Sequence, residues 1–65
     1  MRGSVEVGQI RSWDRNKYSP FIVLKLYSTS LRDYAYVMFF KEPFIYSYTT
    51  RSIEKESRII EGTQQ

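Results

Sequence analysis

The chain has 65 residues and a net charge of +3, and it contains no cysteine and no histidine. A chain of this length forms at most one domain, residues 1–65, and we expect its ends at residues 1–3 and 62–65 to be flexible. Without cysteine no disulfide or thiolate can form, and histidine, the side chain best suited to proton transfer near neutral pH, is also missing. We therefore expect no enzyme, no metal site, no cofactor and no small-molecule substrate.

Targeting signals are also missing from the sequence. No run reaches the roughly 18 apolar residues of a membrane span, and the N-terminus shows no apolar stretch of the kind found in signal peptides. We therefore expect a cytoplasmic protein that does not enter a membrane and is not secreted by a signal peptide.

The first 20 residues predict a strand followed by a loop. Val5 and Val7 alternate with polar residues, and Ile10 resumes this alternation one position out of phase after Gly8. A glycine at such a phase slip indicates a bulge or bend, so we predict a first strand over residues 4–12. Residues 13–20 are mostly polar and end in proline, which indicates a loop.

Residues 21–49 predict three more strands. Residues 21–27 and 34–40 are rich in β-branched and aromatic side chains, and the polar residues 28–33 between them indicate a turn. A short connection over residues 41–43 leads to a fourth strand over residues 44–49. Pro43 stands just before this strand, where its missing N–H costs least.

Residues 51–60 fit two structures. Ile53 and Ile60 lie seven residues apart, and Glu54 and Arg58 form an i,i+4 pair, which favours a helix. The pair Ile59 and Ile60 equally indicates a last short strand after one 3₁₀ turn. We predict a mainly all-β fold, a small five-stranded and partly open barrel with a 3₁₀ or helical turn near residues 51–57.

Two segments resemble SH3-like small β-barrels, including KOW-type domains and the short SH3-like accessory proteins of bacteriophages. The segment V-E-V-G-Q-I-R at residues 5–11 resembles their first strand, and residues 46–60 resemble their closing strand, turn and strand. The resemblance implies an SH3-like barrel and a binding module. It further implies a viral or phage accessory protein, located in the host cytoplasm or in the virion, that acts by protein–protein contact as a virion component or an inhibitor of a host factor. It assigns no functional residue.

The aromatic side chains concentrate in one stretch. Seven of the eleven aromatics lie between Asp33 and Thr50. Because strands have a period of two, the third strand has one apolar face and one tyrosine-rich face. We expect the apolar face to point into the core, with Ala35, Val37 and Phe39. We expect the tyrosine-rich face to point outward, with Tyr34, Tyr36, Met38 and Phe40. On the fourth strand, Phe44, Tyr46 and Tyr48 predict a second aromatic row beside the outward one.

These rows allow two interpretations. They pack on each other and on the loop after the first strand, or they form an exposed patch for a protein partner or for self-association. A second candidate surface is that loop itself, which in SH3-like barrels borders the ligand surface, although Trp13 alternatively caps the open barrel end. The candidate partner-binding residues are Trp13, Arg15, Lys17, Tyr18, Tyr34, Tyr36, Phe40, Tyr46 and Tyr48.

The uneven charge supports a rival hypothesis, nucleic-acid binding. Residues 1–32 carry six basic and two acidic side chains, whereas residues 33–65 carry four basic and five acidic ones. A basic half suits a polyanion, and tyrosines can stack on bases. The candidate phosphate contacts are Arg11, Arg15, Lys17, Lys25 and Arg32.

Overall fold

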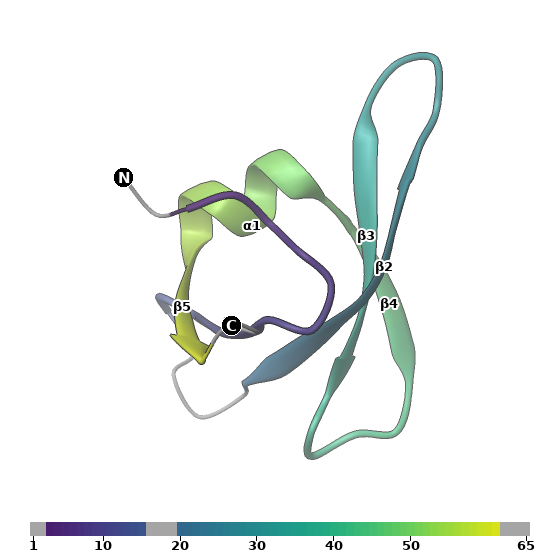
Figure 1. Cartoon of the computed structure of the whole chain (residues 1–65). Helices are drawn as coiled ribbons and strands as arrows, with labels where there is room; N and C mark the ends of the chain where they lie inside the picture. The colour runs from purple at the N-terminus through teal and green to yellow at the C-terminus, as the bar shows by residue number, and fades with distance from the viewer. Residues whose placement is uncertain (1–2, 16–19, 62–65) are drawn as a thin grey trace.

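The structure is a computed structural model that describes residues 3–15 and 20–61, so the expected flexible ends at 1–2 and 62–65 lie outside the described residues (Figure 1). Within the described ranges the chain forms five antiparallel strands in one open sheet and one short helix. The elements are β1 (Ile10–Trp13), β2 (Phe21–Ser28), β3 (Asp33–Phe39), β4 (Ile45–Thr49), α1 (Thr50–Glu56) and β5 (Ser57–Glu61). The strand order is β4-β3-β2-β1-β5, which confirms the mainly-β class.

The longest hairpin joins β2 and β3, close to the bounds expected from the sequence. Its pairing runs from Phe21 opposite Phe39 to Ser28 opposite Asp33, with a shift in register between Val23 and Lys25. The turn between the strands is held by Thr29, whose Oγ1 accepts hydrogen bonds from the backbone N–H groups of residues 31 and 32. Threonine hydroxyls stabilise turns in this way, which explains why the polar segment reverses the chain here.

The first strand is shorter than predicted and lies later in the chain. Gly8 has φ of 93°, a left-handed conformation that breaks an extended strand, and residues 7–8 form a turn. Only residues 10–13 form β1, so the predicted strand over 4–12 was wrong in its first half, and Trp13 belongs to the strand instead of the loop. The segment before β1 still reaches the sheet, because the Gly8 N–H donates to the Val23 carbonyl at 2.9 Å.

Residues 50–61 combine both structures that the sequence left open. Helix α1 ends at Glu56, and β5 pairs with β1, from Ser57 opposite Trp13 to Glu61 opposite Ile10. Ile53 is buried under the sheet whereas Ile60 is exposed on β5, so the two isoleucines do not share a helix face. Among the described residues no helix has the length and apolar character needed to cross a membrane.

The core lies between α1, the N-terminal segment and one face of the sheet. Its fully or almost fully buried apolar residues are Val5, Phe21, Val23, Ala35, Val37 and Ile53, and Trp13, Phe39 and Tyr48 pack against them. The burial of Ala35 and Val37 confirms the inward face expected for the third strand.

The second aromatic row lies on the other side of the sheet from the one predicted. Tyr48 pairs with Ala35 and Tyr46 pairs with Val37, and residues directly opposite each other share a sheet face. Tyr46 and Tyr48 therefore lie on the core face. The outward tyrosines of β3 instead have Ser47 and Thr49 as their neighbours on β4.

Candidate functional site

Five aromatic side chains on the core face contact one another in a closed circuit, which we call the aromatic cluster. The distances between ring centroids are 5.0 Å from Trp13 to Phe21, 5.5 Å from Phe21 to Phe39, and 5.4 Å from Phe39 to Tyr46. The circuit closes through Tyr48, which lies 6.4 Å from Tyr46 and 5.1 Å from Trp13. Edge-to-face and tilted pairs at these distances stabilise a small core beyond the area they bury. The cluster thereby links the first four strands.

A groove opens beside this cluster. Its apolar wall is formed by Trp13 and Tyr48, and its volume is about 580 Å³. The segment after β1 contributes Asp14 and Arg15, and α1 contributes Ser52, Lys55 and Glu56. The groove therefore combines two aromatic rings with a rim that carries two basic and two acidic side chains.

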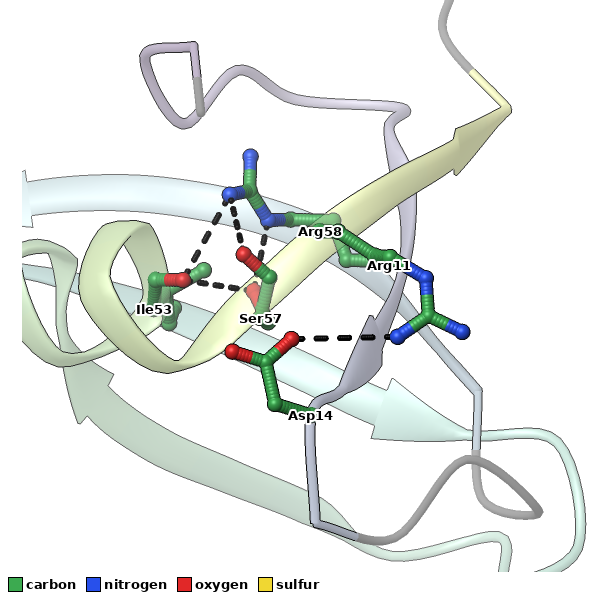
Figure 2. Close-up of polar contacts among 5 residues, drawn as sticks. All are labelled: Arg11, Asp14, Ile53, Ser57 and Arg58. Atoms are coloured by element: carbon green, nitrogen blue, oxygen red, sulfur yellow. Dashed lines mark hydrogen bonds and ion pairs between the residues drawn. The ribbon is translucent and has the colours of Figure 1, made fainter. Parts of the chain in front are cut away.

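Two contacts hold the rim residue Asp14 in place. The Asp14 N–H donates to the Glu56 carbonyl at 2.8 Å, and the Asp14 carboxylate lies 3.7 Å from the Arg58 guanidinium (Figure 2). Both side chains of this ion pair are partly exposed, so the pair adds little to the free energy of folding. The backbone hydrogen bond joins the end of β1 to the end of α1, where the groove begins.

Below the rim, Arg11 is fully buried and ties β1 to the junction of α1 and β5 (Figure 2). Its Nε donates to Ser57 Oγ at 2.8 Å, and its Nη1 donates to Gln9 Oε1 at 2.9 Å. Its Nη2 donates to the carbonyls of Ile53 and Ser57 at 3.4 and 3.3 Å. A side chain with no exposed surface cannot contact a phosphate, so this predicted phosphate contact is corrected to a structural role.

The outward tyrosines stack on a residue that the sequence reasoning missed. Tyr27 lies 5.2 Å from Tyr34 and 4.7 Å from Tyr36, with interplanar angles of 14° and 26°. The Tyr27 hydroxyl shares a hydrogen bond of 2.7 Å with Ser47. Because the rings stack on each other, they offer less ring surface to a nucleic-acid base. Strict alternation within residues 21–27 would place Tyr27 on the core face with Phe21 and Val23, so this pattern could not have found it. The register shift between Val23 and Lys25 turns Tyr27 outward, and its pairing with Tyr34 brings the rings together.

The predicted basic residues that the structure describes do not converge on one surface. Arg15 lines the groove near the start of β2, Lys25 lies opposite Tyr36 on the outer face, and Arg32 lies in the loop after β2. Arg15 and Arg32 lie near opposite ends of β2, and the eight residues of that strand span about 25 Å. The other predicted residues of the first loop, Lys17 and Tyr18, lie outside the described residues.

Two aromatic candidates lie at the β3–β4 end of the sheet. Phe40 is exposed just after β3, and Tyr46 donates a hydrogen bond of 3.1 Å from its hydroxyl to Glu42. This hydrogen bond, with the nearby negative charge, raises the pKa of Tyr46 above its ordinary value of 10.0. Neither residue lines the groove, so the structure divides the predicted partner-binding residues among the groove, the outer face and this end.

Within residues 3–15 and 20–61 no group of acidic side chains is arranged to hold a metal ion. No protein family, no curated protein and no solved structure matches this chain.

Proposed function

We propose that this chain is a non-catalytic binding module that recognises a protein partner in the groove between the end of β1 and α1. The observation that carries the proposal is the pairing of Trp13 and Tyr48 with a charged rim. Aromatic side chains supply large contact area at protein interfaces, and polar residues at the edge provide specificity.

The charges of the rim favour a protein over a nucleic acid. Arg15 and Lys55 would attract phosphates, but Asp14 and Glu56 line the same groove and would repel them. A polypeptide can present both signs of charge and an apolar side chain at once. The dispersed positions of Lys25 and Arg32 support the same choice.

Two features support an SH3-like barrel as part of this proposal. The chain passes from β4 through the short helix α1 into β5, as the resemblance of residues 46–60 implies. The residues that follow β1 border the groove, as the loop after the first strand borders the ligand surface in such barrels.

The chain contains its own reporter for a test, because Trp13 is the only tryptophan and it lines the groove. Peptides selected on the purified protein from a random displayed library should change the emission of Trp13 on binding. Lys55→Glu should weaken binding of a selected acidic peptide by about tenfold or more, since it reverses one charge on the rim.

Arg32→Glu is the matched control, because it makes the same type of charge reversal in the β2–β3 loop, away from the groove. We expect its dissociation constant to stay within about twofold of the wild-type value. If no selected peptide alters Trp13 emission, or if the two variants bind equally, the groove is not the binding site.

A further inference from the structure

Strand β4 is an edge of the sheet. It pairs with β3 on one side, and among the described residues no strand pairs with its other side. An edge strand presents unpaired backbone N–H and C=O groups, which form a template for another strand unless the edge is protected. The two edges of this sheet, β4 and β5, differ in that protection.

The β5 edge carries devices that discourage pairing, whereas the β4 edge does not. Strand β5 contains Arg58 and Glu61, and its pairing with β1 is interrupted by a shift in register at Ile10. Strand β4 has the sequence IYSYT, with no charged residue and no proline, and it pairs with β3 without a shift in register. Charges and bulges are the usual protection of an edge, so β4 is the edge open to a further strand.

Exposed apolar side chains extend this edge into the loop before it. Phe40 and Phe44 flank the β3–β4 loop, and Phe44 is 62% exposed. Ile45, the first residue of β4, is 60% exposed. This loop lies at the opposite end of the molecule from the β2–β3 loop (Figure 1). The edge therefore offers apolar contact area together with unpaired backbone groups.

We propose that a second copy of this chain pairs with β4, antiparallel and about a two-fold axis, to form a continuous sheet across a dimer. In an antiparallel pair, two residues that face each other either both direct their backbone N–H and C=O groups toward the partner strand or both direct them away. When two identical strands pair about a two-fold axis, the centre of the pairing is therefore one residue that faces its own copy. Ser47 is the middle residue of β4. Centring there places Tyr46 of each copy opposite Tyr48 of the other, and such aromatic pairs stabilise antiparallel strands.

Opposite charges lie beyond the two ends of β4. Antiparallel pairing centred on Ser47 brings the β3–β4 loop of one copy, which carries Glu42, beside the first turn of α1 in the other copy, which carries Arg51. Glu42 and Arg51 are both exposed. The symmetry repeats this opposite-charge pair, so the edge complements itself. Tyr48 belongs both to β4 and to the wall of the groove, but the pairing is made by the backbone edge of β4, and its test substitutes Ile45 and Ser47, which do not line the groove.

Sedimentation velocity over about 10 μM to 1 mM protein tests the association. A five-residue edge buries less than the roughly 1,200 Å² of a standard interface, so we expect a reversible dimer with a dissociation constant above the nanomolar range. Ile45→Lys should raise that constant by about tenfold or more, because lysine protects an edge from pairing.

Ile60→Lys on β5 is the matched control, since it adds the same charge at a site that is 54% exposed. It should leave dimerisation within about twofold of the wild-type value. A wild-type chain that stays monomeric throughout this range overturns the proposal. So does a chain whose association is weakened by Ile60→Lys and not by Ile45→Lys.

A cross-link tests the register without depending on affinity. The chain has no cysteine, so Ser47→Cys introduces a single thiol. Pairing centred on residue 47 brings the two Cα atoms to about 4.5–5.5 Å, within the range that a disulfide spans. Under mild oxidation Ser47→Cys should form a disulfide dimer far faster than Leu31→Cys, although Leu31 is 87% exposed. Equal rates overturn the proposed register.

Discussion

At the scale of single residues, two buried serines on neighbouring strands differ in their hydrogen bonds. Ser57 Oγ accepts from Arg11 and donates to the Ile53 carbonyl. Ser12 is equally buried, but its Oγ finds no hydrogen-bond partner among the described residues. Because a buried polar group is costly only when it is left unpaired, these two hydroxyls should contribute with opposite sign to the free energy of unfolding.

Replacing each serine by alanine tests this difference. Ser57→Ala leaves the Nε donor of Arg11 without that partner and should lower the free energy of unfolding by about 1–3 kcal/mol. Ser12→Ala removes an unpaired hydroxyl and should be neutral or slightly stabilising. Urea unfolding followed by Trp13 fluorescence measures both. Equal losses for the two variants would show that the Arg11 network does not stabilise the fold.

The hydrogen bond between Tyr46 and Glu42 predicts how the stability of the fold depends on pH. This hydrogen bond favours the neutral phenol, and so the pKa of Tyr46 is raised above 10.0 in the folded chain. A raised folded pKa contributes stability that is fully present below the unfolded pKa of about 10 and is lost as pH rises through the folded pKa. Titration of the tyrosine ring carbons by NMR should show Tyr46 ionising late.

Glu42→Gln should lower the pKa of Tyr46 toward its ordinary value, because the negative charge is removed. Glu61→Gln removes the same charge from β5 and serves as the control, with no expected change in the pKa of Tyr46. A titration curve of Tyr46 that is unchanged by Glu42→Gln would contradict this assignment.

At the scale of elements, α1 depends on a cap that the sequence analysis did not identify. Thr49 is extended, and its Oγ1 accepts a hydrogen bond of 3.2 Å from the Ser52 N–H. This contact satisfies one of the free N–H groups at the start of the helix. Because α1 supplies Ser52, Lys55 and Glu56 to the groove, the cap also positions one wall of the candidate site.

Thr49→Ala should therefore lower the free energy of unfolding by about 1 kcal/mol, the usual cost of losing a cap. Thr49→Ser keeps the capping oxygen and should retain most of the stability. Thermal unfolding measured by circular dichroism compares the two variants with the wild-type chain. A serine variant as unstable as the alanine variant would assign the effect to the lost methyl group instead of the cap.

At the scale of the whole molecule, the distribution of charge supports the proposed protein partner over a nucleic acid. Of the predicted phosphate contacts, Arg11 is buried, and Arg15 and Arg32 lie at opposite ends of β2. The described residues among these predicted contacts therefore do not form one cluster. We therefore expect a polyanion to bind less tightly than the net charge of +3 would allow.

Fluorescence anisotropy of labelled single-stranded and duplex oligonucleotides tests this expectation at about 50 and 200 mM salt. With one or two phosphate contacts, the slope of log K against log salt should lie near −1 to −2, and binding should be weak. Arg15→Glu should change this weak binding little. A slope of about −4 or steeper, with micromolar affinity at the higher salt concentration, would favour nucleic acid over a protein partner.

The sequence by itself determined which residues form the strands of the central hairpin and which face of β3 is apolar, because both depend on local side-chain preference and a period of two. It also indicated a break at Gly8, and near the C-terminus it left open a helix or a turn followed by a last strand. Only the tertiary structure decided that Tyr46 and Tyr48 share the core face, since that follows from their pairing with Val37 and Ala35. Arg11 is buried by contacts with residues that are distant in the chain, such as its partner Ser57, 46 residues away. The local sequence pattern contains no information about such contacts.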